Sequence, residues 1–548
     1  MSTYSTSVPE NKKDTAELKN PFNGETYYRG KLQVKVDSNE LLGSEAQAVF
    51  KRQMQFIPAT THPDFPAIID PTHIALGPFL SGINDNLFFD ACLNVGTNAV
   101  FGYNHPNIFP KLQNLGRMLA GYMGAGTDFF FACRNGAPAP QDLAELMTGL
   151  AKDAYGEEYM MNFANAGTEA NENAFKFAMF NKFKSLKSSL GEDLYRSMCE
   201  QLGYKTLHLQ NGDLWSNYPL FLMSFQGAFH GRTATSNSLS MSKTKQKEGY
   251  QAVPYVVHVP FTKDIDFNSC IDETPIEDLI KNKTLADVIK SGKAPADLLA
   301  AIIMEPIQGE GGYVIPDHEL LKKVSDFVGK YRPRGLSLIS DEVQTGLYRT
   351  GTFTGMQNWY AKHPNLRPDI MSFAKPLHVG GVLVQKRIAK DWPGGKVSGT
   401  WAEGNLLGIA MAVYTLEEMK RVDPALGKPY PEHCIEAGKY LRDSIAAMAG
   451  RLEKKFPGAS VISNIRGVGQ MNAFDVPGAD FQNDIVYKSF LHGLHILGTG
   501  KRSIRIFGTV DQRQREADML IGILEDVITE VAESSSSLKK SEASSHAR

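Results

Sequence analysis

The sequence predicts an α/β protein, with a large domain built on a mostly parallel sheet and a smaller α+β domain. From residue 138 to about residue 398, apolar runs of strand length alternate with helix-like stretches, which is typical of a parallel sheet with helices on both faces. Beyond Trp401, two helical patterns precede two short strand-like runs and a final helix, so the architecture changes there. A chain of 548 residues is also too long for one simple core.

The elements of the large domain follow from this alternation. Helical patterns cover Ala144–Ala151 and Asn171–Phe183, and a polar insertion runs over Lys184–Tyr218. The strand-like runs are Glu158–Phe163, Leu220–Phe225, Leu298–Met304, Gly335–Ser340, Asp369–Ala374 and Gly381–Gln385. Ligands of such sheets bind outside the carboxyl ends of the strands, so the polar residues after these runs are the candidate site.

The smaller domain is predicted from both ends of the chain. Leu87–Asp90 and the glycine-containing stretch after it suggest a small antiparallel piece. The C-terminal elements are helices over Leu406–Lys420 and Ala437–Leu452, strands over Gly467–Phe474 and Ser503–Ile506, and a last helix with Leu520, Ile523, Leu524, Val527, Ile528 and Val531 on one face.

Composition shifts predict the domain boundaries. We expect a mobile N-terminal arm over residues 1–43, because this stretch is polar, and a disordered tail over 534–548, because it is rich in serine. Between them we expect the N-terminal part of the small domain (44–105), the large domain (106–398) and the C-terminal part of the small domain (399–533).

The charge and cysteine content exclude several classes of protein. A formal net charge of -2 gives no reason to expect a nucleic-acid or membrane partner. Five scattered cysteines favour a reducing compartment and argue against a disulfide framework or a zinc cluster, and no metal site is predicted. The N-terminus lacks the apolar run of a secretory signal and carries acids that a mitochondrial transit peptide avoids, so we expect a cytoplasmic protein.

Two strand-end charges form the centre of the candidate site. Asp341 ends one apolar run, and an unpaired carboxylate that loses solvent there needs a cationic partner. Lys375 ends another run, where desolvation and nearby cations would lower its pKa and free the amine to form a Schiff base. A cofactor with a basic nitrogen and an aldehyde would fit between the two side chains. A direct Asp341–Lys375 ion pair explains them equally well.

Three further turns carry polar residues after strands. Gly167 and Thr168 lie between a strand and a helix, where free N–H groups can bind a phosphate or simply form an ordinary capped helix start. Phe229 could stack on an aromatic ring, and Arg232 could bind a carboxylate. Alternatively, Phe229 is an ordinary core residue and Arg232 an ordinary surface residue. Glu310 lies among glycines, where it is either a solvated loop acid or the partner of an arginine.

Together, these segments resemble the class III aminotransferases, a family that uses pyridoxal 5'-phosphate (PLP) on the type I fold. The resemblance spans Leu87–Ile528 and is nearest to 4-aminobutyrate and L-lysine 6-aminotransferases. The segments that carry it are Ala166-Gly-Thr-Glu-Ala170, Ala228-Phe-His-Gly-Arg-Thr233, Glu305-Pro-Ile-Gln-Gly-Glu-Gly-Gly312, Asp341-Glu-Val-Gln-Thr-Gly346, the Lys375 segment and Gly399-Thr400-Trp401. The chain departs from the family in having Ala166 before the glycine of the phosphate turn and Ile506-Phe507-Gly508 after Arg505.

The resemblance implies a role for each matching residue. Lys375 would bind PLP as a Schiff base and shuttle the proton, and Asp341 would hold the pyridine nitrogen protonated. The other cofactor-binding residues would be Gly167 and Thr168 at the phosphate, Phe229 and Val343 on the ring faces, Gln344 at the phenolic oxygen, His230, and Thr400 from the second subunit of a homodimer. Arg232 would bind a substrate carboxylate, while Glu310 and Arg505 would form a gate.

The resemblance also implies the reaction. A terminal amino group of an ω-amino acid, of the 4-aminobutyrate or lysine type, would pass to 2-oxoglutarate and give a semialdehyde and glutamate. Alternatives within the fold are an ornithine aminotransferase, a decarboxylating transaminase or an aminomutase. A non-catalytic dimeric relative is a further alternative, which the presence of both Asp341 and Lys375 disfavours.

Overall fold

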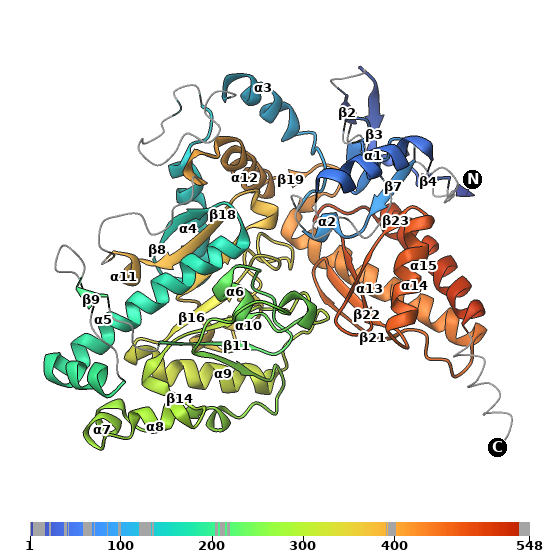
Figure 1. Ribbon diagram of the computed structural model, residues 1–548. Coiled ribbons are helices and arrows are strands. Elements are labelled where there is room, and N and C mark those ends of the chain that lie inside the picture. The colour runs from blue at the N-terminus through green and yellow to red at the C-terminus, as the bar shows by residue number, and fades with distance from the viewer. Residues whose placement is uncertain are drawn as a thin grey trace, which may run out of the picture.

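A computed structural model gives the structure of the chain (Figure 1). The structure describes residues 2–3, 17–20, 24–37, 41, 43–57, 68–70, 72–84, 86–96, 100–119, 133, 136–202, 207–208, 214–215, 220–390, 392 and 402–535.

A seven-stranded sheet forms the large part of the molecule. Its strands are β8 (Tyr159–Ala164), β11 (Phe221–Phe225), β12 (Val256–Val259), β15 (Leu299–Met304), β16 (Ser337–Asp341), β17 (Ile370–Phe373) and β18 (Gly380–Gln385). Their order is β12-β11-β15-β16-β17-β18-β8, and every neighbouring pair is parallel except the two that involve β18. The α/β class and the mostly parallel sheet are therefore confirmed.

Both faces of this sheet are apolar and are covered by helices, which explains why the sequences of its strands are continuous apolar runs. On β15, Ala301 and Ile303 share a core with α5, whereas Ile302 and Met304 share a core with α9. The helices around the sheet are α4 (Pro140–Tyr155), α5 (Gly167–Gln201), α6 (Ala234–Leu239), α7 (Ile276–Lys281), α8 (Leu285–Lys290), α9 (His318–Tyr331), α10 (Gln357–Tyr360), α11 (Lys386–Ala389) and α12 (Leu406–Met419).

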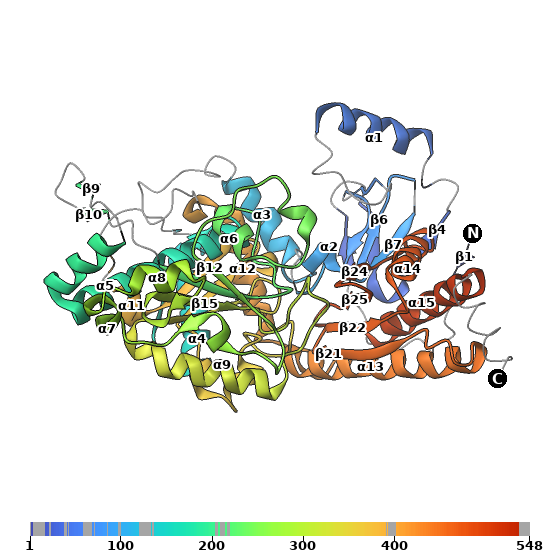
Figure 2. The same cartoon turned by 60° about the horizontal axis from the view of Figure 1, so that its bottom comes forward.

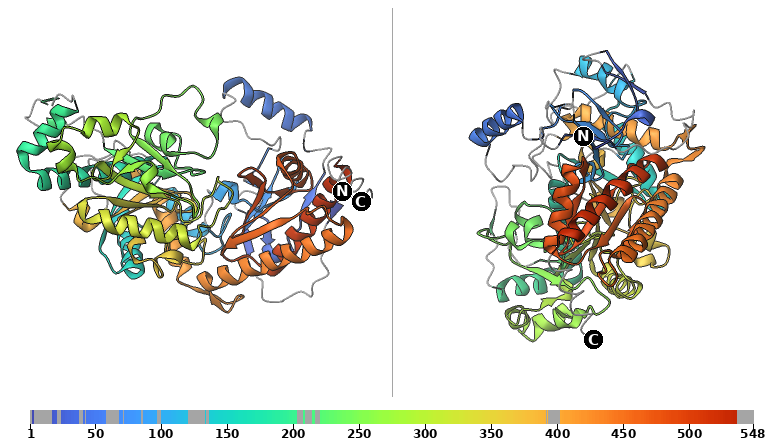
Figure 3. Two further views of the ribbon diagram at one scale, coloured as in Figure 1. Left: turned by 90° about the horizontal axis from the view of Figure 1, so that it is seen from below. Right: turned by 90° about the vertical axis from the view of Figure 1, so that its right-hand side faces the viewer.

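The other lobe combines the two ends of the chain, as Figures 2 and 3 show by the blue strands beside orange and red elements. One sheet contains β1 (Ser2–Thr3), β4 (Lys35–Val36), β5 (Ala75–Leu76), β6 (Phe79–Ser81), β7 (Leu87–Asp90) and β23 (Leu494–His495). A second sheet has the order β21 (Ser463–Val468), β22 (Met471–Asp475), β25 (Ser503–Phe507) and β24 (Leu497–Thr499). The helices α13 (Tyr430–Lys455), α14 (Ala479–Leu491) and α15 (Gln514–Ser534) pack into the same hydrophobic core.

The remaining elements are short or peripheral. The helices are α1 (Ser44–Phe56), α2 (Leu93–Gly96) and α3 (Phe109–Leu119). The paired strands are β2 (Glu17–Lys19) with β3 (Thr26–Tyr28), β9 (Leu207–His208) with β10 (Leu214–Trp215), β13 (Ile271–Asp272) with β14 (Ala294–Pro295), and β19 (Val422–Asp423) with β20 (Lys428–Pro429). Among the residues that the structure describes, no helix is both long enough and apolar enough to cross a bilayer.

The structure corrects several expectations about individual elements. The helix predicted to end at Phe183 continues to Gln201 as α5, with a break at Gly191 (φ 67°), so the first half of the supposed insertion is helical. The single strand predicted over Gly467–Phe474 is a hairpin of β21 and β22, because Gly469 turns the chain with a positive φ of 55°. Strand β12 was missed.

Two structural details bear on the expected domain boundaries. Helix α12, assigned to the smaller domain, packs against α4 and shares a core with the large sheet. The N-terminal arm was expected to be mobile, but in its described part Arg29 is buried and forms ion pairs with Asp511 and Glu516. The tail from residue 536 onward lies outside the described residues.

Candidate active site

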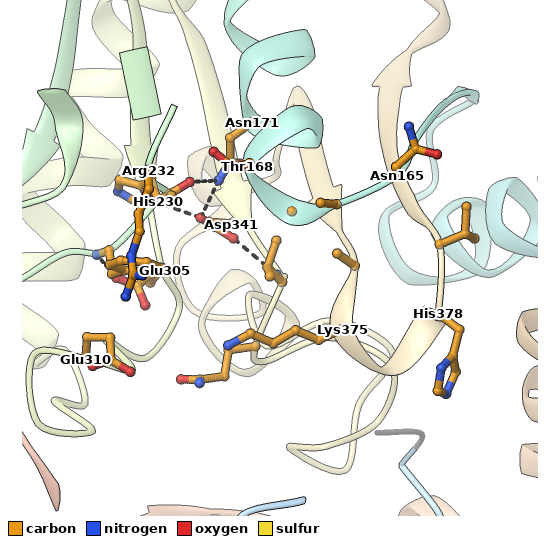
Figure 4. Close-up of a pocket in the computed structure, with 18 residues that line it drawn as sticks. Asn165, Thr168, Asn171, His230, Arg232, Glu305, Glu310, Asp341, Lys375 and His378 are labelled. Atoms are coloured by element: carbon orange, nitrogen blue, oxygen red, sulfur yellow. Dashed lines mark hydrogen bonds and ion pairs between the residues drawn. The ribbon is translucent and has the colours of Figure 1, made fainter. Parts of the chain in front are cut away.

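A cavity of about 490 Å³ lies at the carboxyl ends of the large-sheet strands, where the sequence placed the site (Figure 4). The predicted residues that line it are Gly167, Thr168, Phe229, His230, Arg232, Glu310, Asp341, Val343, Gln344 and Lys375. Arg505 reaches the cavity through its ion pair with Glu310. Thr400 lies outside the described residues.

Asp341 is the last residue of β16 and is held on both carboxylate oxygens. Oδ2 accepts a hydrogen bond from Asn171 Nδ2 (2.9 Å) and lies 2.8 Å from His230 Nδ1. Oδ1 accepts from the backbone N–H of Val343 (3.1 Å). These contacts fix the buried carboxylate of Asp341 in one orientation. Within the part of the chain that the structure describes, Asp341 and Lys375 form no ion pair. The direct-pair alternative is therefore wrong.

Lys375 follows β17 and begins the short 3-10 helix η8 (Lys375–Leu377). Its φ of 40° lies in the left-handed region, which a residue with a side chain rarely adopts and which local structure must enforce. Burial and, after it, the positive charge of Arg505 lower the pKa of the amine to about 8. Figure 4 shows the side chain extending below Asp341 toward the side where Glu310 lies.

The turn between β8 and α5 places the first N–H groups of a long helix at the cavity. Helix starts leave such groups without intrahelical partners, which makes them suited to bind an anion. Gly167 fits closely, because an added Cβ would lie 2.8 Å from Val343 Cγ1. The Thr168 hydroxyl is 2.8 Å from that of Thr233, so the turn is braced by the loop that follows β11.

Phe229 and Gln344 line the cavity from two different loops. The Phe229 ring has the Arg232 guanidinium about 6.0 Å from its centroid, and Arg232 itself is exposed at the cavity. Gln344 Oε1 is buried without a hydrogen-bond partner in the described part of the chain. A Cβ on Gly309 would lie only 1.8 Å from this oxygen, so Gly309 leaves the space that Gln344 occupies.

Glu310 forms the predicted ion pair with Arg505. The distance from Glu310 Oε1 to Arg505 Nη1 is 2.6 Å, and the two side chains are 14% and 5% exposed. Burial alone would raise the pKa of Glu310, but the charges of Arg505 and Lys243 outweigh it and hold the pKa at about 2. The carboxylate is therefore ionised across the physiological range.

Comparisons with known proteins identify the family of the chain. The family model described as aminotransferase class-III matches residues 67–528. The chain belongs to this family.

Relatives named as aminotransferases are similar to this chain at low identity. The chain is similar to the acetylornithine aminotransferase of Methanocaldococcus jannaschii, with 30% identity over 67% of this chain and 74% of the relative. It is also similar to the mitochondrial 4-aminobutyrate aminotransferase of Sus scrofa, with 24% identity over 83% of each chain. The fold matches that of the lysine aminotransferase of M. tuberculosis, with a TM-score of 0.67 and 21% identity over 89% of this chain and 99% of that one.

Class III aminotransferases depend on PLP, and the residues of this cavity fit that cofactor. The cavity offers a carboxylate for a ring nitrogen, a helix start for a phosphate and an amine for an aldehyde. Four residues that line it have a buried atom without a hydrogen-bond partner among the described residues: Asn171 Oδ1, His230 Nε2, Gln344 Oε1 and His378 Nε2. A polar cofactor could provide partners for such atoms.

Several residues that line the cavity were not predicted as site residues, among them Asn171, Glu305 and His378. Asn171 lies one helical turn after Gly167, and that spacing could have placed it on the cavity face. Glu305 accepts hydrogen bonds from the N–H groups of Phe229 and Gly309, which joins two loops, and burial raises its pKa to about 7. His378 also lines the cavity, and no signal in the sequence separated it from an ordinary turn residue.

Proposed function

We propose that this aminotransferase moves the terminal amino group of an ω-amino acid, of the 4-aminobutyrate or lysine type, to 2-oxoglutarate. The products are a semialdehyde and glutamate. The observation that carries the proposal is the buried pair of Glu310 and Arg505. Relatives named as 4-aminobutyrate aminotransferases and a structural neighbour named as a lysine aminotransferase support it.

The ion pair suits a site that must accept two different substrates in turn. The carbon that carries a terminal amine has no carboxylate beside it, so a bare arginine near that carbon would lose solvent without gaining a partner. While the donor is bound, Glu310 neutralises Arg505. The 2-oxo acid has a carboxylate next to its reacting carbon, and Arg505 can then exchange Glu310 for that carboxylate in a two-pronged ion pair.

The other residues of the cavity hold and move groups around the reacting carbon. PLP, when bound, supplies the electron sink that stabilises negative charge at that carbon. Asp341 keeps a proton on the ring nitrogen, because its own orientation is fixed by Asn171 and His230. Lys375 Nζ takes the proton from the substrate carbon and returns it, which its lowered pKa favours at neutral pH.

Binding contacts complete the proposed site. The N–H groups at Gly167 and Thr168 hold the phosphate, Phe229 and Val343 cover the ring faces, and Gln344 and His230 contact its polar edge. Arg232, exposed at the cavity, binds the distal carboxylate of the substrate. In a homodimer, Thr400 of the partner subunit adds a phosphate contact.

A panel of amino donors tested against 2-oxoglutarate, with glutamate formation as the readout, tests this proposal. We expect 4-aminobutyrate or lysine to support turnover at least about tenfold faster than alanine or aspartate, which carry a carboxylate beside the amine. Turnover with α-amino donors alone would contradict an ω-aminotransferase.

An acetylornithine or ornithine donor is the second candidate. The similarity to the acetylornithine aminotransferase of M. jannaschii favours this donor class. The reacting amine of both compounds is also terminal. The same panel separates it, because glutamate formation with acetylornithine or ornithine, and not with 4-aminobutyrate or lysine, would select this donor class.

A further inference from the structure

The Glu310 carboxylate binds a second cation, which the sequence did not predict. Oε1 contacts Arg505, and Oε2 lies 3.3 Å from Lys243 Nζ. Arg505 belongs to β25 in the C-terminal sheet, whereas Lys243 follows α6 on the side of the large sheet. Each oxygen of the carboxylate therefore faces a different cation from a different lobe.

The segment before Lys243 is hydrogen-bonded to the loop that carries Phe229 and His230. Ser240 Oγ accepts from the backbone N–H of His230 (2.8 Å) and donates to the carbonyl of Ser236 (2.8 Å). The N–H of Met241 donates to the carbonyl of Ala228 (2.6 Å). The loop that carries Phe229 and His230 thus fixes the backbone two residues before Lys243.

The backbone around Glu310 is held from the other lobe. The hydroxyl of Thr499 donates to the carbonyl of Gly309 (2.6 Å), and the N–H of Gly500 donates to the carbonyl of Glu310 (3.0 Å). Arg466 Nε donates to the carbonyl of Gly312 (3.2 Å). Because these contacts hold the loop on both sides of Glu310, the exchange of partners is carried out by side chains rather than by a loop movement.

Release of Arg505 would leave a mostly buried carboxylate without its main partner. A buried charge that loses its partner is strongly destabilised, which would oppose the turn of Arg505 toward a substrate carboxylate. Lys243 can offset this cost. Its side chain is 51% exposed and flexible, so its amine can approach Glu310 without a large desolvation penalty of its own.

We propose that Lys243 is a positioning residue of the gate, which holds the Glu310 carboxylate when Arg505 binds the 2-oxo acid. This inference rests on the proposed function of the Glu310–Arg505 pair. It assigns the gate three members, and it predicts that loss of Lys243 weakens the acceptor half of the reaction and not the donor half.

The test compares the two half-reactions in Lys243→Gln by rapid mixing. We expect the KM for 2-oxoglutarate, measured with enzyme loaded with the amine form of the cofactor, to rise about three- to fivefold, the effect of one half-exposed ion pair. The donor half-reaction with PLP-loaded enzyme should stay within about twofold. Calorimetry with glutarate, a non-reacting dicarboxylate, should show a similar loss of affinity without any turnover.

Matched variants separate a gate role from a general structural one. Lys243→Arg should restore the acceptor KM, because it keeps the cation. Lys245→Gln is the control, since Lys245 is exposed and makes no ion pair with any residue that the structure describes, and it should behave as the wild type. In a Glu310→Gln background, Lys243→Gln should have no additional effect, because its partner charge is gone.

The outcomes distinguish this inference from the proposed function. If Glu310→Gln alters the two half-reactions equally, the gate itself is wrong. If Glu310→Gln alters them unequally while Lys243→Gln matches the wild type, the gate stands and the role of Lys243 is overturned. A Lys243→Gln variant that impairs both half-reactions equally would also overturn it.

Discussion

Asp341 and Glu310 are carboxylates of the same cavity, but their partners differ in kind. Asp341 is held by Asn171, His230 and the backbone N–H of Val343, all in helix α5 or in loops that follow strands of the large sheet. Glu310 is held by two cations on separate lobes. Under the proposed function, the first arrangement fixes a group that serves the cofactor throughout the cycle, whereas the second can exchange a partner when the substrate changes. The cofactor side of the cavity, with Asp341 and Lys375, and the substrate side, with Glu310 and Arg505, can therefore be tested separately.

The largest expected effect lies on the cofactor side. Lys375→Ala removes the only amine that lines the cavity among the described residues, so under the proposed function proton transfer at the substrate carbon would lose its base. We expect turnover to fall by at least about a thousandfold. The absorbance of bound PLP should show that the cofactor is still held, and Lys362→Ala, at an exposed lysine, should behave as the wild type. Turnover within tenfold of the wild type would remove Lys375 from the mechanism.

A second prediction concerns the pH at which Lys375 becomes reactive in the cofactor-free protein. The neutral amine is the nucleophile, and burial with the nearby Arg505 lowers its pKa from 10.5 to about 8. Reactivity should therefore rise with pH around a midpoint near 8. At that pH an unperturbed lysine would be neutral in roughly one molecule in 300.

The measurement follows the addition of a small uncharged aldehyde between pH 6 and pH 10. Subtraction of the trace of Lys375→Ala removes the contribution of surface lysines. A midpoint above 10 would show that the amine is solvated, and the cofactor side would then be less enclosed than its geometry indicates.

The smallest effect is expected at Gly309, which joins the two sides. Its N–H donates to Glu305, and its α-carbon faces Gln344. Gly309→Ala should displace Gln344 and weaken PLP binding about three- to tenfold, as overpacking of a fixed site does. Cofactor titration measures this change. Gly450→Ala is the control, because a Cβ there meets open space, and unchanged PLP affinity in Gly309→Ala would mean that Gln344 does not contact the cofactor.

The cofactor side was predictable from the sequence because its residues follow buried strands. Parallel strands bring their carboxyl ends to one edge, so Asp341 and Lys375 had to lie near each other once the strands were recognised. Apolar runs that are buried on both faces are also easy to detect. Residues such as Asn171 were missed because a polar residue in a helix has many ordinary roles.

The substrate side was harder to predict. Glu310 and Arg505 are separated by 195 residues and lie on different lobes, and only the resemblance to a family suggested their pairing. Lys243 has no distinguishing neighbour in the sequence, and its contact depends on how a loop folds back along the 228–231 turn. The antiparallel direction of β18 and the place of α12 depend in the same way on tertiary packing.

The pairing of β23 with β7 has a consequence for the order of folding during synthesis. The large sheet has all its strands once residue 385 has been made, so it can form while the chain is still growing. The other lobe must wait, because β7 needs residues 494–495 and Arg29 needs Glu516, which lies 487 residues later. Until then the apolar residues of its first strands lack their C-terminal core partners, so the nascent N-terminal segment exposes apolar surface of the kind that chaperones bind.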